Sequence, residues 1–284
     1  MAAFLAAVLL LTVPCSANSA RSAVVLDCVS GRLLLDQKGS EKSLIASTTK
    51  IMTALLVCER CNVLDQMVIP KQAVGIEGSS MYLKEGERLT LQELLYGLML
   101  SSGNDAAVGL ALYCCGSIQE FANLMNDKAR SLGMTGSHFE NPNGLDSPNH
   151  YSTARDLAIL ASYAMENPIF QKTVSTRTVT VGDRVLRNHN KLLWLYPEAD
   201  GVKTGYTKAA GRILVSSAVR DSRRLVAVTI HDPNDWADHA AMLNRGFENF
   251  RLRRIVTVGD CVGKLEIVGG DPAQVSVLAA ENFA

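Results

Sequence analysis

The chain has 284 residues, of which 48% are hydrophobic and 20% are charged, as in a globular protein with one large domain and room for a small appendage. This composition excludes a chain that is disordered along its length. Lysine plus arginine and aspartate plus glutamate both number 28, so the formal net charge is zero. Without a basic excess to neutralise phosphates, nucleic acid is not expected as a partner.

The N-terminus predicts export. In MAAFLAAVLLLTVPCSANSA an apolar run of about ten residues precedes small residues, the pattern of a secretory signal peptide over residues 1–19. Cleavage after Ala17 and cleavage after Ser19 both fit. The run is short for a membrane span, so a retained N-terminal anchor is the less favoured alternative. We expect the mature protein at the outer face of the cytoplasmic membrane, in the periplasm or in the cell wall.

Seven cysteines are present, and Cys58 and Cys61 form a C-x-x-C pair. No second pair stands at the spacing of a zinc finger. The pattern therefore favours small buried apolar side chains over a structural metal site or a disulfide.

The first predicted elements are two strands in SAVVLDCVSGRLLLDQKG, joined by a Ser-Gly turn. Residues 47–60 then have the apolar character of a central, buried helix. A polar stretch of loop and short strands is expected next, up to the T-L-Q-E capping box of Thr90 and Glu93. The helix that starts there is expected to break at Gly103, after which a helical pattern resumes.

Two more capped helices are predicted, from Ser117 to Gly133 and from Ser152 to Pro168. From about residue 173 the sequence alternates like strands with tight turns, and a last amphipathic helix follows in DWADHAAMLNRGFENF. Helices in the middle, with strands from both ends of the chain, predict an α+β fold whose sheet collects strands from distant segments.

Ser47 and Lys50 are the first candidate pair, because residues three apart on a helix project to the same side. A serine hydroxyl becomes a nucleophile when a base takes its proton, and a neutral lysine can be that base. Burial and a second cation both lower the pKa of a lysine. The backbone N–H of a serine at a helix N-terminus is also a ready oxyanion donor. For this pair taken alone, an N-cap serine followed by a surface lysine is the favoured alternative.

Two further motifs change that balance. The S-G-N at residues 102–104 lies at the predicted helix break, where side chains can project into a cleft. The K-T-G at residues 203–205 begins a strand-like stretch. S-x-x-K, S-x-N and K-T-G in this order are the signature set of penicillin-recognising serine acyltransferases. The three together are far more specific than any one of them.

On these motifs the chain resembles the serine-type D-alanyl-D-alanine carboxypeptidases, the low-molecular-weight penicillin-binding proteins of the S11 type. The segments ASTTKIMTALL, LLYGLMLSSGNDAA, HFENPNGLD, YSTARDLA and DGVKTGYTKAAGR also read like that family. The resemblance covers residues 20–250 and implies a β-lactamase/transpeptidase-like catalytic domain, an antiparallel sheet flanked by helices plus a helical subdomain. Residues 251–284 resemble the start of the family's β-rich second domain, without its amphipathic membrane helix. Peripheral membrane association therefore stays an open expectation.

The resemblance implies a role for each motif residue. Ser47 attacks the carbonyl of the penultimate D-alanine and forms an acyl-enzyme, with Lys50 as general base. Ser102 relays the proton to the leaving D-alanine, and Asn104 positions the peptide and Lys50. Water then hydrolyses the acyl-enzyme.

The K-T-G strand is implied to bind the substrate. Lys203 keeps Lys50 neutral and attracts the terminal carboxylate, to which Thr204 donates a hydrogen bond. Gly205 lets the substrate approach the strand closely, and the backbone N–H groups of Ser47 and Tyr206 form the oxyanion hole. Some relatives hold the carboxylate with a late arginine, for which HDPNDWADHAAML offers no counterpart.

The expected partners are peptidoglycan stem peptides and β-lactams, and no metal or organic cofactor is required. A class A type β-lactamase is disfavoured because no E-x-x-L-N-like segment is present. Endopeptidase or transpeptidase activity stays open, since it depends on cleft shape. A catalytically silent wall-binding protein is disfavoured because every motif side chain is present. Trp194 and Trp236 are expected to be packing residues, and His138 and Asp146 to organise the N-G-L-D loop.

Overall fold

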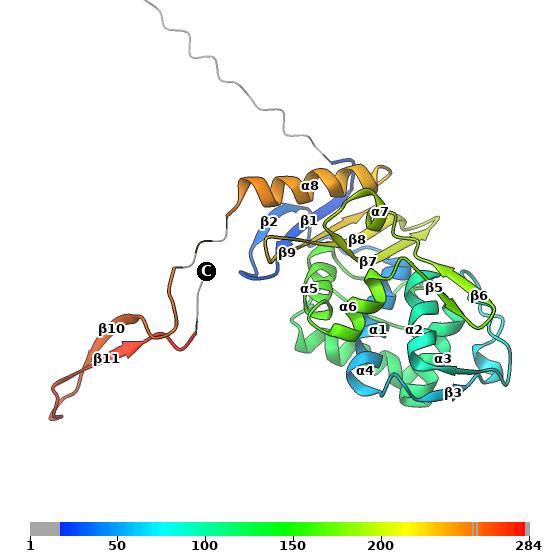
Figure 1. Cartoon of the computed structure of the whole chain (residues 1–284), viewed down its shortest axis with the longest axis horizontal. Coiled ribbons are helices and arrows are strands. Elements are labelled where there is room, and N and C mark those ends of the chain that lie inside the picture. The colour runs from blue at the N-terminus through cyan, green and yellow to red at the C-terminus, as the bar shows by residue number, and fades with distance from the viewer. Residues whose placement is uncertain (1–17, 252, 254, 282–284) are drawn as a thin grey trace, which may run out of the picture.

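The computed structural model describes residues 18–281 except 252 and 254 (Figure 1). The predicted signal peptide, residues 1–19, thus lies almost wholly outside the described residues. Among the described residues, no helix is both long and apolar enough to cross a membrane.

A five-stranded antiparallel sheet forms one half of the main body, in the order β2-β1-β9-β8-β7. Its strands are β1 (Ser22–Asp27), β2 (Leu33–Gln37), β7 (Ala199–Thr207), β8 (Gly211–Arg220) and β9 (Arg223–Ile230). The N-terminal hairpin joins the C-terminal strands through β1 and β9, where Val24 lies opposite Val228. The prediction that the sheet collects distant segments is confirmed.

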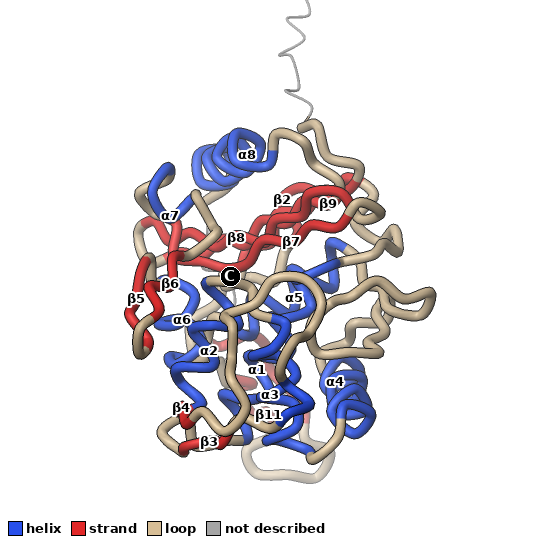
Figure 2. Tube along the Cα trace, turned by 90° about the vertical axis from the view of Figure 1, so that its right-hand side faces the viewer, coloured by secondary structure: helices blue, strands red, loops and turns tan. Residues whose placement is uncertain are grey.

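Both faces of the sheet are covered, which explains why β1 is buried at every residue. Along β1, Ala23 and Val25 pack into the cluster beneath α8 (Asp235–Asn249), while Val24 and Leu26 pack into the core of the helical region. This is the period of two that a strand imposes on its side chains. Figure 2 shows the sheet between α8 and the helical region.

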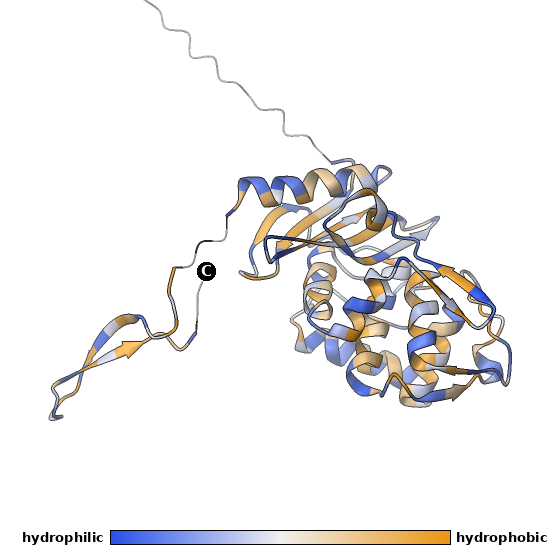
Figure 3. Cartoon of the chain, in the orientation of Figure 1, coloured by the Kyte–Doolittle hydropathy of each residue, from blue (hydrophilic) through white to orange (hydrophobic). Residues whose placement is uncertain are grey.

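The helical region surrounds one buried helix. Its helices are α1 (Lys50–Arg60), α2 (Leu91–Leu100), α3 (Asn104–Cys115), α4 (Ile118–Ser131), α5 (Ala154–Ala164) and α6 (Pro168–Ser175). Helix α1 is buried from Lys50 through Cys58 and contacts all five of the others. Figure 3 shows the apolar residues of these helices gathered toward the interior. The predicted central, buried helix and the α+β class are confirmed.

The predicted capping box is present in full, with Thr90 and Glu93 each bonded to the other's backbone N–H. Two other predicted boundaries are wrong. Thr153, not Ser152, caps α5 by accepting a hydrogen bond from the Asp156 N–H. Pro168 does not end that helix but begins α6, since proline at the first helical position loses no intrahelical bond.

Smaller elements complete the chain: the 3-10 helices η1 (Ala46–Thr49) and η2 (Lys71–Ala73), α7 (Leu192–Leu195), and the hairpins β3 (Gln66–Val68) with β4 (Arg88–Thr90), β5 (Thr178–Val181) with β6 (Arg184–Arg187), and β10 (Cys261–Glu266) with β11 (Gln274–Leu278). The last hairpin is almost wholly exposed and is drawn away from the main body in Figure 1. The division of the chain at residue 250 remains a prediction.

Candidate active site

Ser47 lies in η1, one turn before the buried part of α1, and its side chain lines a cavity. The residue before it, Ala46, has φ of 45°, a backbone region that costs a non-glycine residue about 1–3 kcal/mol. The loop that carries Gly144 packs against this strained peptide. A Cβ at Gly144 would lie 1.9 Å from the Ala46 carbonyl oxygen, so only glycine fits there. Ser47 therefore projects from a turn against which the Gly144 loop is closely packed.

Lys50 is fully buried, and its Nζ has three partners. The Nζ lies 2.9 Å from Ser47 Oγ, 2.7 Å from Asn104 Oδ1 and 2.6 Å from the Asn143 carbonyl oxygen. The two carbonyl oxygens can only accept, so they take two N–H groups of the amine. In a neutral amine the remaining position is a lone pair, and it faces the Ser47 hydroxyl. This is the arrangement that a general base requires.

The electrostatics favour that neutral amine. Burial lowers the pKa of Lys50 well below its usual value, and the nearby Lys203 ammonium lowers it further against the opposing effect of Asp105. Lys203 is itself buried, which lowers its pKa to about 7. The charge of Lys203 thus favours the neutral form of Lys50, the effect that the family resemblance implied.

The predicted helix break at residues 101–103 is present between α2 and α3. Ser102 has φ of 60°, is 4% exposed and lines the same cavity as Ser47. Behind it, the Asp105 carboxylate accepts from Ser80 Oγ at 2.6 Å and from two backbone N–H groups, those of Met81 and Leu83, at 3.1 Å each. This carboxylate fastens the loop before β4 to the start of α3. The position of Ser102 is thus set by buried hydrogen bonds.

Strand β7 forms the opposite wall. Thr204, Gly205 and Tyr206 line the cavity, and the Lys203 ammonium lies behind them and donates to the Thr204 carbonyl oxygen at 2.9 Å. A Cβ at Gly205 would lie 3.2 Å from the Ile45 carbonyl oxygen. The glycine therefore lets β7 pack against the turn that carries Ser47, a different reason from the substrate approach expected from the sequence.

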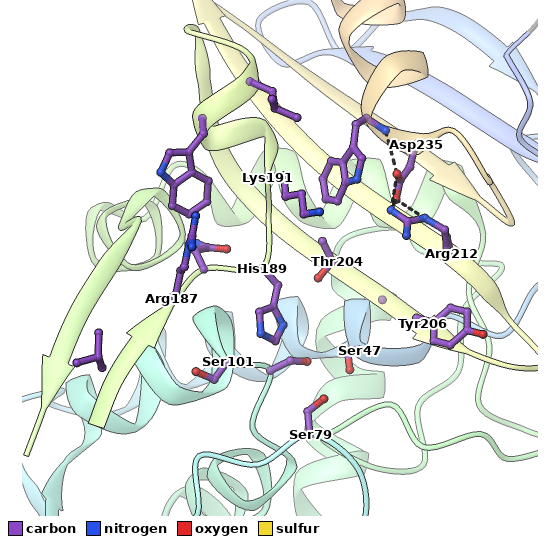
Figure 4. A pocket seen from close by; sticks show the side chains of 17 residues that line it. Ser47, Ser79, Ser101, Arg187, His189, Lys191, Thr204, Tyr206, Arg212 and Asp235 are labelled. Atoms are coloured by element: carbon purple, nitrogen blue, oxygen red, sulfur yellow. Dashed lines mark hydrogen bonds and ion pairs between the residues drawn. The ribbon is translucent and has the colours of Figure 1, made fainter. Parts of the chain in front are cut away.

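The cavity has a volume of about 990 Å³ and runs between the helical region and the edge of the sheet (Figure 4). The predicted residues Ser47, Ser102, Thr204, Gly205 and Tyr206 line it. The remaining three, Lys50, Asn104 and Lys203, are buried behind its wall. Lys50 and Asn104 are linked to the lining by the hydrogen-bond chain to Ser47.

Comparison with known proteins identifies the group to which this arrangement belongs. The profile of the peptidase S11 family, described as D-alanyl-D-alanine carboxypeptidase, matches residues 11–234. The chain belongs to this family. D-alanyl-D-alanine carboxypeptidase DacF of Bacillus subtilis is 33% identical, covering 94% of this chain and 72% of the relative. DacD of Escherichia coli is 34% identical, covering 93% of this chain and 72% of the relative. Among solved structures, penicillin binding protein 5 from Haemophilus influenzae matches with a TM-score of 0.88 and 30% identity. The match covers 94% of this chain and 82% of that one.

These likenesses confirm the resemblance seen in the sequence and the transpeptidase-like fold class. A DD-transpeptidase of Streptomyces K15 also shares the fold, with a TM-score of 0.78 and 31% identity over 81% of this chain and 98% of that one. Carboxypeptidases and a transpeptidase of the family thus share one scaffold.

Several lining residues were missed in the sequence. Trp194 and Trp236 line the cavity instead of serving only as packing residues. Arg212 reaches it from β8, where it lies opposite Tyr206, and pairs with Asp235 at 2.7 Å. Its position in the A-A-G-R stretch, shortly after K-T-G, is the sequence feature that could have predicted its place near the site. Only the strand register reveals that this arginine faces the cleft.

The Asn143 carbonyl was also missed, because a backbone contact leaves no mark in the residue type. Contacts of His138 fit its predicted role in organising the loop around it, and the role predicted for Asp146 stays a prediction. His138 Nδ1 lies 2.6 Å from the Asn149 carbonyl oxygen, and His138 forms a backbone bridge with Tyr151. The N-G-L-D loop thus positions the Asn143 carbonyl against Lys50.

Proposed function

We propose that this family member removes the terminal D-alanine from peptidoglycan stem pentapeptides through an acyl-enzyme on Ser47. The family assignment makes it a serine-type D-alanyl-D-alanine carboxypeptidase. The observation that carries the catalytic assignment is the contact of Lys50 Nζ with Ser47 Oγ at 2.9 Å, made by an amine whose other partners are two carbonyl oxygens.

In the proposed first step, Lys50 takes the Ser47 proton as Oγ attacks the penultimate carbonyl. The backbone N–H groups of Ser47 and Tyr206 stabilise the oxyanion. The C–N bond then breaks, and the proton passes through Lys50 and Ser102 to the amine of the leaving D-alanine. Water enters, attacks the ester and gives its proton to Lys50, which regenerates the Ser47 hydroxyl and releases the shortened peptide.

The K-T-G strand defines the direction of the substrate. Lys203 and Thr204 would hold the carboxylate of the terminal D-alanine, and Tyr206 would donate to the scissile carbonyl. The leaving residue therefore lies toward Thr204, and the acyl part of the peptide lies toward Tyr206. A β-lactam carries an equivalent carboxylate and carbonyl, so it would acylate the same serine.

The substrate also suggests where the protein acts. Stem pentapeptides are exposed outside the cytoplasm, and the sequence of residues 1–19 is that of a signal peptide. We therefore place the enzyme at the outer face of the cytoplasmic membrane, in the periplasm or in the cell wall. Peripheral membrane association is part of this proposal.

D-alanine release tests the proposal. Purified protein is incubated with diacetyl-L-lysyl-D-alanyl-D-alanine, and free D-alanine is measured over time. We expect turnover by the wild type and by Ser30→Ala, an exposed serine in the β1–β2 turn, and none by Ser47→Ala. Turnover by Ser47→Ala at the wild-type rate would contradict the nucleophile assignment.

A further inference from the structure

Helices α1 and α3 begin together at the active site. Lys50 is the first residue of α1 and Asn104 is the first residue of α3, and Lys50 Nζ lies 2.7 Å from Asn104 Oδ1. The two helices pack against each other and have nearly the same length (Figure 2). Because every helix rises about 1.5 Å per residue, two such helices that run side by side also end close together.

The far ends of the two helices meet in the structure. Tyr113 Oη, in the last turn of α3, donates a hydrogen bond to Asp65 Oδ2 in the loop that follows α1, at 3.1 Å. Arg60, the last residue of α1, and Cys115, the last residue of α3, line the same surface hollow of about 340 Å³. Contacts at both ends therefore hold α1 and α3 side by side in the same direction.

Three cysteines lie at this junction. Cys61 directly follows α1, and Cys114 and Cys115 end α3. They are free thiols, half-buried against the hydrophobic core, as the sequence favoured. The side chains of Cys61 and Cys114 also interact with each other as hydrogen-bonding partners. Direct interaction of two thiols from different segments is the arrangement from which a disulfide forms.

The surroundings of this pair favour its oxidised form. Burial raises the pKa of Cys61, and it raises the pKa of Cys114 to about 11. A raised pKa disfavours the thiolate, so the reduced pair lacks the stabilisation that makes a disulfide strongly oxidising. A bond between the two residues would also close a loop over residues 62–113 and lower the entropy of the unfolded chain. Both effects make the disulfide resistant to reduction.

We propose that Cys61 and Cys114 form a disulfide that joins the far ends of α1 and α3, by exchange with an external disulfide. The Cys61 thiolate attacks one sulfur of the external disulfide, and the other sulfur leaves as a thiolate. The Cys114 thiolate then attacks the Cys61 sulfur and expels the second external thiolate. Two electrons pass to the external disulfide, and its two thiolates take up the protons that the cysteines lose. This site goes beyond the proposed function and does not depend on the reaction of Ser47.

Peptide mapping tests for the bond. The whole protein is incubated with excess glutathione disulfide at alkaline pH, where thiolates form, then alkylated with N-ethylmaleimide and digested with trypsin without reduction. We expect two alkylated cysteines fewer than after treatment with dithiothreitol, and one pair of cross-linked peptides. Trypsin cleaves after Arg60, so Cys58 and Cys61 fall on different peptides.

Variants assign the bond within the Cys114–Cys115 pair, which stays on one peptide. Cys61→Ala and Cys114→Ala should each abolish the cross-link. Cys115→Ala, the matched control at the neighbouring position, should keep it. Cys28→Ala removes a half-buried thiol in the β1–β2 turn and should keep it as well.

Urea denaturation measures what the bond does to the fold. We expect a higher urea midpoint for the oxidised wild type than for the protein reduced with dithiothreitol, because the cross-link restricts the unfolded chain. Cys114→Ala should have the same midpoint after either treatment. A bond that forms without raising the midpoint would overturn the stabilising role.

Equal alkylation of the wild type after glutathione disulfide and after dithiothreitol would overturn the inference. Glutathione that stays attached to Cys61 would do the same, since it would show that Cys114 does not reach the Cys61 sulfur. A cross-link that persists in Cys114→Ala would contradict the assignment of the partner. Each of these outcomes leaves the proposed release of D-alanine intact.

Discussion

Lys50 places an amine where an apolar side chain would be more stable. It is fully buried, and its Nζ lies within hydrogen-bond distance of Ser47 Oγ, Asn104 Oδ1 and the Asn143 carbonyl oxygen. The sequence predicted the pair with Ser47 and the lowered pKa only once the S-x-N and K-T-G motifs were considered with it, since the spacing alone favoured a surface lysine. It could not predict the Asn143 carbonyl, which reaches Nζ through the fold of a loop 93 residues away in the chain.

Replacing Lys50 by methionine should separate catalysis from stability. We expect Lys50→Met to lower the rate of penicillin acylation by about 1,000-fold or more, since nucleophile and base act as a unit. The free energy of unfolding should stay equal or rise, because a buried amine is exchanged for an apolar side chain of similar length. Stopped-flow acylation and urea denaturation measure the two effects. An acylation rate near that of the wild type would make Lys50 a structural residue.

Lys203 should influence the pH at which Lys50 becomes active. Its positive charge helps to lower the pKa of Lys50, so Lys203→Gln should raise that pKa. The acid limb of the acylation rate, which rises with pH as Lys50 loses its proton, should then move to higher pH. A lost carboxylate contact alone would lower the rate at every pH and leave the midpoint in place. An unmoved midpoint would therefore contradict the electrostatic role.

At the scale of elements, the site depends on how η1, the loop 141–146 and β7 are held together. Gly144 leaves room for the Ala46 carbonyl oxygen where any Cβ would clash, and at Gly205 an added Cβ would be tight, 3.2 Å from the Ile45 carbonyl oxygen. The sequence predicted α1 to α5, α8, the break at Gly103 and the K-T-G strand from periodicity and capping, but it did not predict α6 or α7. It offered no reason for glycine at position 144 and a different reason, substrate approach, at position 205, because both contacts join segments distant in the chain.

Gly144→Ala should disable the site. Gly144 has φ of 87°, and an added Cβ would lie 1.9 Å from the Ala46 carbonyl oxygen, beside the nucleophile. We expect at least a tenfold loss of acylation or a loss of ~3 kcal/mol or more in stability, since either the peptide of Ala46 or the loop must move. The acylation rate and the free energy of unfolding are both measured on purified protein.

Gly182→Ala is the matched control. Gly182 also has positive φ, at 59°, but its missing Cβ faces open space in the β5–β6 turn. Only backbone strain of about 1 kcal/mol is expected, with acylation unchanged. Equal effects of the two substitutions would show that strain, and not contact with Ala46, limits the site.

At the scale of the whole molecule, the sequence predicted the α+β class and a sheet assembled from both ends of the chain, since strand and helix patterns are local. The lining of the cleft could not be predicted in the same way. Arg212 comes from β8 and Trp194 from α7, and only the folded chain brings them to one cavity.

Two buried histidines should make the fold sensitive to acid. Burial lowers the pKa of His239 to about 3 and that of His150 to about 4, against about 6.5 in an unfolded chain. Below pH 6.5 the unfolded state binds more protons, so stability is fully present above that pH and falls on acidification toward pH 4. Each histidine contributes up to about 1.4 kcal/mol per pH unit.

Urea denaturation between pH 7 and pH 5 measures this slope. His239 lies between Ser216 Oγ and Thr229 Oγ1. Whatever its effect on absolute stability, His239→Asn should lower the number of protons taken up on unfolding by one, and with it the change of the free energy of unfolding with pH. A slope that His239→Asn leaves unchanged would contradict the account of the buried neutral imidazole.

The central claim is that Ser47 is the nucleophile of an acyl transferase. Mass spectrometry of the protein after mixing with benzylpenicillin, followed by peptide mapping, tests it most directly. We predict one covalent adduct of the drug, on the peptide that contains Ser47. An adduct on a different residue, or an unmodified protein beside intact drug, would contradict the account.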